Sequence, residues 1–250
     1  MEKREKFSLK EIREAGDDLK NLTINFHPYP ILSPYVSYFI INYLPLTPNY
    51  ISFLWGIIGL IGAAVIMHGG YWWMLAGILI YHLGFILDCT DGELARLSKK
   101  CTIGGAYLDK FFHFVHRAVL VLAVGIGIYN TTGEILYLYL GIGISTIFLI
   151  DNLGKLKVYE IFANKERFDL VKKMQKSYEE ECESERENFL GISKKYAIEM
   201  LRPANPFTLL FFAIVFNMAQ YYLILMAIVT PLFFIKSFFN VYKKISNIPS

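Results

Sequence analysis

Long apolar runs alternate with short polar connectors along most of this chain. A helix needs about 20 apolar residues to cross a bilayer. Six segments meet or approach that length: 50–68, 71–88, 110–129, 134–152, 204–218 and 220–241. A short turn near Asn217 to Gln220 is all that separates the last two. The pattern predicts an all-α integral membrane protein with six transmembrane helices.

The remaining segments are more polar and predict helices outside the membrane core. Ser8 to Glu11 reads SLKE, which has the form of a capping box at the start of a helix. The apolar segment after Pro34, YVSYFIINYL, is too short to span and is predicted to lie in the interface. The chain then divides into N-terminal cytoplasmic and interfacial helices (1–48), transmembrane helices one to four (49–152), a helical cytoplasmic excursion (153–203), and transmembrane helices five and six with a cytoplasmic tail (204–250).

Composition and charge support this division and give an orientation. Only 19% of the residues are charged and 54% are hydrophobic, whereas soluble proteins carry about 25% charged residues. A net charge of +3 gives no indication of nucleic acid as a partner. The connectors 68–70, 130–133 and 217–220 contain no Lys or Arg. The positive-inside rule therefore predicts that both termini and the 89–109 loop are cytoplasmic.

Acids and a histidine gather in the run DCTDGELARLSKKCTIGGAYLDKFFH, residues 88–113, between two apolar segments. If the second transmembrane helix continues through this run, four residues share one face: Asp88, Asp91, Gly92 and Ala95. The third helix presents Gly105, Asp109 and His113 at successive i+4 steps. Carboxylates from two facing helices are typical of a site for hard divalent cations. Two such ions could clamp a diphosphate, and Arg96 could donate to its phosphate oxygens.

The same run resembles the signature of the CDP-alcohol phosphotransferase (CDP-alcohol phosphatidyltransferase) family. That signature is D-x2-D-G-x2-A-R, eight or nine residues, then G-x3-D-x3-D. Seven of its eight defining positions are present, with eight residues in the gap: Asp88, Asp91, Gly92, Ala95, Arg96, Gly105 and Asp109. The segment LTPNYIS is similar to the family's TPN-x-x-T stretch, with Ser52 in place of Thr. The resemblance implies six helices, cytoplasmic termini, an N-terminal interfacial helix and a homodimer.

The activity implied by the resemblance is that of a membrane transferase with its active site at the cytoplasmic face. A CDP- or CMP-activated donor would pass a phospho-alcohol group to the hydroxyl of a lipid or small alcohol, and CMP would leave. The three aspartates Asp88, Asp91 and Asp109 would bind two Mg²⁺ or Mn²⁺ ions. Gly92, Ala95 and Gly105 match positions that shape the nucleotide pocket. Asn49 could reach the nucleotide, although helix capping explains it equally well.

His113 departs from the signature, which has an aspartate there that ligates metal and deprotonates the acceptor. Three interpretations remain open. His113 could do both jobs, since a neutral imidazole ligates metals and has a pKa near 6.5. The site could instead hold fewer ions or favour Mn²⁺, which tolerates nitrogen ligands. In the third, His116, which is followed by Arg117, replaces His113 in this role. The first choice of catalytic residues is His113 with Asp109 and Asp91.

Basic residues near the 88–113 run and other classes of function also enter the predictions. Four basic residues are candidates for holding an anionic acceptor or a lipid headgroup: Arg117, His116, Lys155 and Arg202. Positive-inside topology explains Lys155 and Arg202 just as well. A cation-binding transporter is the alternative from another class, but its acids are expected nearer the bilayer midplane and on discontinuous helices. A variant that binds a CDP-alcohol without turnover is a third hypothesis.

Overall fold

The computed structural model describes residues 6–22, 29–44, 46–99, 102–164 and 206–246. Within these ranges the chain forms eight α-helices and no strand. The helices are α1 (Leu9–Leu22), α2 (Tyr29–Tyr43), α3 (Pro48–Met67), α4 (Tyr71–Leu97), α5 (Ile103–Thr132), α6 (Ile135–Asn164), α9 (Pro206–Val215) and α10 (Ala219–Ser246).

Five of the described helices are long and apolar enough to cross a membrane: α3, α4, α5, α6 and α10. The predicted all-α integral membrane protein is confirmed for the part of the chain described. The sixth predicted span, 204–218, corresponds to α9, which has 10 described residues. The count of six spans therefore stays a prediction. The turn predicted near Asn217 is present, and Asn217 adopts the left-handed conformation with φ 57°.

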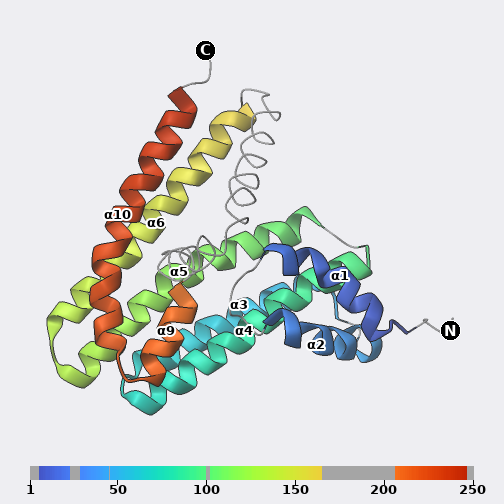
Figure 1. The fold of residues 1–250 in the computed structure, drawn as a ribbon, viewed down its shortest axis with the longest axis horizontal. Helices are drawn as coiled ribbons and strands as arrows, with labels where there is room; N and C mark the ends of the chain where they lie inside the picture. The colour runs from blue at the N-terminus through green and yellow to red at the C-terminus, as the bar shows by residue number, and fades with distance from the viewer. Residues whose placement is uncertain (1–5, 23–28, 45, 100–101, 165–205, 247–250) are drawn as a thin grey trace, which may run out of the picture.

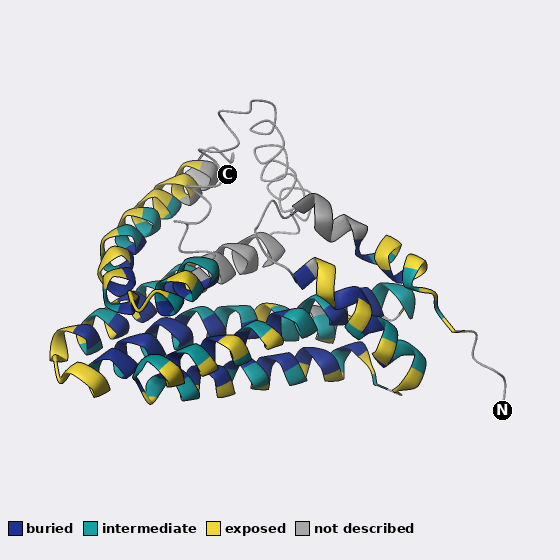
Figure 2. Cartoon of the chain, turned by 60° about the horizontal axis from the view of Figure 1, so that its bottom comes forward, coloured by how far each residue is buried: buried dark blue, intermediate teal, exposed yellow. Residues whose placement is uncertain are grey.

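Helices α3, α4 and α5 pack together, and α6 continues from α5 to lie beside α10 (Figure 1). Figure 2 shows buried residues along the facing sides of these helices and exposed residues on their outer sides. Side chains from five helices are fully buried in the core: Ile66, Ile78, Leu120, Leu210 and Leu223. The outer face of α3 carries a stripe of exposed apolar side chains: Tyr50, Phe53, Ile57 and Ile61. An apolar outer face of this kind fits contact with lipid.

The N-terminal helices α1 and α2 pack on each other and on α4 (Figure 1). The capping box predicted for α1 is confirmed. The Ser8 amide and hydroxyl both donate to Glu11 Oε2, each over 2.7 Å, and these bonds lower the pKa of the Glu11 carboxyl. Helix α2 begins at Tyr29 and includes Pro34, so the predicted start after Pro34 was wrong. Pro30 lies in the first turn, where the backbone amides have no helical partner, whereas Pro34 lies inside the helix and cannot donate to the Pro30 carbonyl.

The helices that carry the 88–113 run extend beyond their apolar segments. Helix α4 continues to Leu97 rather than ending at residue 88, and α5 begins at Ile103 rather than 110. Helix α6 likewise continues to Asn164, and the rest of the predicted excursion (165–203) lies outside the described residues. An apolar segment marks only the part of a helix that lies in lipid. These helices continue into polar sequence, so their ends lie beyond the predicted ones. The second transmembrane helix therefore continues past residue 88 as far as Leu97, which includes Asp91, Gly92 and Ala95.

Glycines allow the backbones of the packed helices to approach closely. A Cβ atom on Gly77 of α4 would lie 2.6 Å from the Gly62 carbonyl oxygen of α3, and one on Gly62 would lie 2.8 Å from the Gly77 oxygen. Gly125 of α5 meets Gly141 of α6 in the same way. Small residues at such crossings are a common basis of helix association in membranes.

We therefore expect Gly77→Ala to lower the free energy of unfolding by about 1–3 kcal/mol, as overpacking of a tight contact does. Unfolding in detergent, followed by circular dichroism, measures the effect. Gly143→Ala is the matched control, because a Cβ there meets nothing within 4 Å. Its expected effect is neutral or slightly stabilising, since Ala favours a helix over Gly. Equal stability of the two variants would contradict this account of the α3–α4 contact.

Candidate active site

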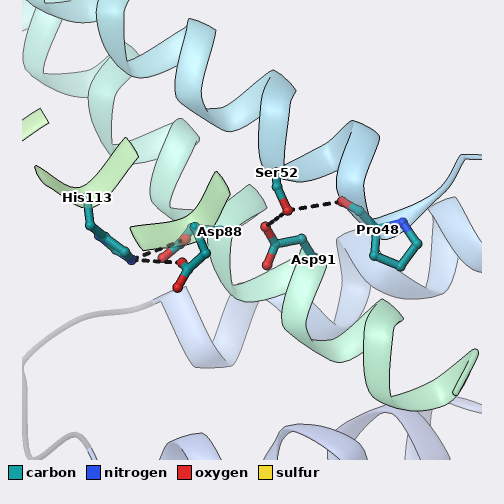
Figure 3. A network of polar contacts seen from close by, with 6 residues as sticks. Pro48, Ser52, Asp88, Asp91 and His113 are labelled. Atoms are coloured by element: carbon teal, nitrogen blue, oxygen red, sulfur yellow. Dashed lines mark hydrogen bonds and ion pairs between the residues drawn. The ribbon is translucent and has the colours of Figure 1, made fainter. Parts of the chain in front are cut away.

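The facing sides of α4 and α5 bring three side chains of the 88–113 run together. His113 Nε2 lies 3.2 Å from Asp109 Oδ1 on its own helix and 3.5 Å from Asp88 Oδ1 on α4 (Figure 3). The i+4 spacing within α5 accounts for the first contact, and the packing of α4 near α5 accounts for the second. The side chains of His113 and Asp109 are 31% and 35% exposed, so ligands can reach them.

These three residues form a group that could hold a metal ion. One ligand atom from each of Asp88, Asp109 and His113 lies within 4.8 Å of the other two. Two carboxylates and an imidazole suit divalent ions that accept oxygen and nitrogen ligands. The donor set therefore fits the kind of metal expected from the sequence.

Asp91 lies apart from this group among the described residues. It follows Asp88 by three residues, nearly one turn of α4. Its side chain accepts a hydrogen bond of 2.5 Å from the Ser52 hydroxyl of α3 (Figure 3). Ser52 Oγ also lies 3.2 Å from the Pro48 carbonyl oxygen, one turn earlier in α3. A hydroxyl has a single proton, and the shorter contact to a carboxylate is the stronger bond. The predicted set of four ligands thus divides into three that meet and one that α3 holds separately.

A second group forms where α3 and α5 begin. Thr102 caps α5 by accepting a 3.0 Å hydrogen bond from the Gly105 amide, and its hydroxyl donates to Asn49 Oδ1 over 3.2 Å. A Cβ on Gly105 would lie 2.7 Å from Asn49 Oδ1, so these two predicted nucleotide-site residues are neighbours. Thr47, not Asn49, caps α3, so the capping interpretation of Asn49 was wrong.

Arg96 lies over Gly92 on the next turn of α4. A Cβ on Gly92 would lie 3.4 Å from Arg96 Nη1, so the glycine leaves space that the guanidinium fills. Arg96 Nε donates a 2.5 Å hydrogen bond to the Ala15 carbonyl of α1. Arg96 Nη2 is buried and has no hydrogen-bond partner within the described residues. Ala95 is partly buried on the same helical turn.

The other histidine candidate lies deeper in the bundle. His116 is 1% exposed, its Nε2 donates to the Gly56 carbonyl over 2.9 Å, and its ring packs against Trp55 and Tyr81. The ring of His116 is therefore enclosed and bound to the backbone, whereas that of His113 is 31% exposed.

Of the three remaining basic candidates, the structure describes only the side chain of Arg117. It is partly buried in α5 and interacts electrostatically with Asp151 of α6, which accepts a 3.2 Å hydrogen bond from Ser237 of α10. Lys155 belongs to α6. Arg202 lies outside the described residues.

Ser52 and Thr102 are site residues that the sequence did not identify as such. In the sequence, Ser52 is distinguished only by standing in place of the threonine of the TPN-x-x-T stretch. A threonine directly before the helix that carries Gly105 and Asp109 is a recognisable capping signal. The contact of Ser52 with Asp91 depends on how α3 packs on α4, which has no signal in either segment.

Comparison with known proteins places this geometry in a family. A family model described as CDP-alcohol phosphatidyltransferase matches residues 45–178. The matched range contains helices α3 to α6 and the whole 88–113 run. No curated protein matches the chain significantly.

We expect Asp88→Asn and Asp109→Asn each to weaken Mn²⁺ binding about tenfold or more. The expectation rests on the grouping of their oxygens, since loss of even outer partners of a metal site costs about 10–100-fold in affinity. Electron paramagnetic resonance of free Mn²⁺ in a titration of detergent-solubilised protein measures the change. Glu134→Gln is the carboxyl control, because Glu134 is exposed in the turn between α5 and α6. Unchanged Mn²⁺ affinity in both aspartate variants would contradict the proposed grouping.

Proposed function

The chain belongs to the CDP-alcohol phosphatidyltransferase family, and on that premise we propose that it is an active transferase that moves a phospho-alcohol group to a hydroxyl acceptor in a membrane. The donor is a CDP- or CMP-activated compound, and the acceptor is a lipid or a small alcohol. The acceptor oxygen forms a bond to the phosphorus distal to cytidine, and the bond from that phosphorus to the bridging oxygen breaks. CMP leaves with the electron pair of the broken bond.

The observation that carries this proposal is the meeting of Asp88, Asp109 and His113 on facing sides of α4 and α5. All three lie inside the range matched by the family model. Because they are partly exposed, a donor and an acceptor can reach the same point. A purely structural ion pair would have no need of this grouping of two acids with one histidine.

We propose that the carboxylates Asp88, Asp91 and Asp109 hold Mg²⁺ or Mn²⁺, with Asp91 providing oxygens for a second ion. Bound divalent ions supply the positive charge that neutralises a diphosphate as its bond breaks. Among the chain's own groups, the partly buried guanidinium of Arg96 can donate to a phosphate oxygen. The Asn49 amide beside Gly105 can bind the nucleotide.

His113 takes the proton of the acceptor hydroxyl in this proposal. A neutral imidazole has one lone pair, so it cannot ligate an ion and accept a proton at the same moment. Three aspartates already provide the oxygen ligands that a hard cation prefers. The two carboxylates at 3.2 and 3.5 Å would also stabilise the imidazolium formed when His113 accepts the proton. We therefore assign His113 the role of base rather than ligand.

The proposal includes a topology that follows from charge and helix count. Six spans, with residues 206–215 in the fifth, return the chain to its starting side. The distribution of Lys and Arg then supports cytoplasmic termini and a cytoplasmic active site. Family membership supports a homodimer.

For the reaction, we expect the unaltered protein to release CMP from at least one member of a panel of CDP-alcohols offered with hydroxyl acceptors and Mg²⁺ or Mn²⁺. His113→Ala is expected to lower that rate about 10²–10⁴-fold, the usual contribution of a general base. Its donor and Mn²⁺ affinities are expected to change little. His68→Ala, at the opposite end of α3, is the histidine control.

Two outcomes would change the proposal. If His113→Ala loses Mn²⁺ binding together with activity, His113 is a ligand. If the unaltered protein binds CDP-alcohols but releases no CMP with any acceptor or metal, it is a binding variant and not a transferase.

A further inference from the structure

A buried carboxylate lies inside the 88–113 run at a position that the family signature leaves open. Glu93 follows Gly92 on α4 and is 1% exposed. Its Oε1 accepts a 2.6 Å hydrogen bond from Ser33 Oγ, and its Oε2 accepts another from Ser37 Oγ. Ser33 and Ser37 are both fully buried and lie one turn apart on α2. An enclosed carboxylate is costly unless such donors satisfy it, so this arrangement fixes Glu93 on α2.

The contact determines how α4 is turned about its axis. Successive residues of a helix are rotated by about 100°, so Glu93 and Asp91 point to nearly opposite sides of α4. Glu93 is held by α2, while Asp91 is held by Ser52 of α3. Rotation that improved one contact would break the other. The turn that carries Asp91 is therefore held from two sides.

Helix α1 closes around the same turn. A Cβ on Gly16 would lie 3.0 Å from Glu93 Oε1, so a larger residue there would require the carboxylate to shift by a few tenths of an ångström. Ala15, which directly precedes Gly16 on α1, also contacts α4, because its carbonyl accepts a hydrogen bond from Arg96 Nε. Glu93 and Arg96, three residues apart on α4, thus both contact α1 at successive residues. The N-terminal helices hold the face of α4 that lies behind the site.

We propose that Glu93 is a positioning residue, whose two hydrogen bonds to Ser33 and Ser37 set the direction in which Asp91 faces the substrate. The proposal rests on the proposed function for its effect on catalysis, but its effect on metal binding can be measured without turnover. Glu93 itself contacts α2 and α1 and has no role in the bond changes. It acts through the orientation of α4.

The test compares Glu93→Leu with Glu93→Gln. A leucine fills the space but accepts no hydrogen bond, whereas glutamine can accept from one serine and donate to the other. Glu93→Leu is expected to weaken Mn²⁺ binding and raise the KM for the CDP-alcohol about tenfold, as loss of outer partners of a metal site does. Glu93→Gln is expected to stay within about threefold of the unaltered protein, because hydrogen bonding to α2 is kept.

A second variant protects the test against misfolding of Glu93→Leu. Ser33→Ala combined with Ser37→Ala removes both donors from α2 and leaves α4 unaltered, and it is expected to weaken Mn²⁺ binding similarly. Ser145→Ala is the matched control, because Ser145 is 7% exposed and donates over 2.9 Å to the Ala118 carbonyl in the α5–α6 contact. Its Mn²⁺ affinity is expected to be unchanged, although its stability falls.

Unaltered Mn²⁺ affinity in folded Glu93→Leu, or in the folded double serine variant, would overturn the positioning role. Equal loss in Glu93→Gln and Glu93→Leu would also overturn it, because the retained hydrogen bonding would then have no effect. A protein that shows the expected differences in Mn²⁺ affinity but never releases CMP would retain the positioning role and refute the transferase. The two proposals can therefore fail separately.

Discussion

Backbone hydrogen bonding in α4 continues without a break from Tyr71 to Leu97, through the boundary between apolar and polar sequence. Because the helix does not end at residue 88, Asp88 and Asp91 keep the rotation that packing in the apolar half gives them. The close contact of Gly62 with Gly77 sets that packing. In the polar half, Ser33 of α2 binds Glu93 and Ser52 of α3 binds Asp91, from opposite sides of α4. A stiff helix fixed along its length is what allows side chains from α3, α4 and α5 to meet reproducibly.

The sequence predicted the helices well where apolar residues report burial in lipid, and poorly at their polar ends. Residues 89–97 and 103–109 are helical although they are rich in charge and glycine, because their tertiary contacts compensate for weak local preference. The grouping of Asp109 with His113 could be predicted, since i+4 spacing in one helix dictates it. The bonds of Asp91 to Ser52 and of Arg96 to Ala15 could not, because they depend on how α3 and α1 lie against α4.

Replacement of a carboxylate by the imidazole of His113 changes the charge as well as the chemistry of this group. An aspartate at position 113 would bring three carboxylates together, and these would repel one another strongly unless ions were bound. Asp88 and Asp109 with one neutral imidazole carry one negative charge fewer. The single N–H on His113 Nε2 can moreover be donated to Asp109 or shared with Asp88, whereas an ionised carboxylate in its place has no proton to donate. The local group is therefore less dependent on bound cations for its integrity.

The Thr102 cap has a consequence for how this sequence can change in length. A residue inserted after the cap, between Ile103 and Asp109, would rotate Asp109 and His113 by about 100° away from α4. A residue inserted before the cap would leave the internal register of both helices as it is. Within the 88–113 run, a residue added between Leu97 and Thr102 therefore keeps the group together, and this stretch lies inside the gap of eight or nine residues that the family signature allows. The hydroxyl of one threonine marks the boundary between tolerated and disruptive insertions.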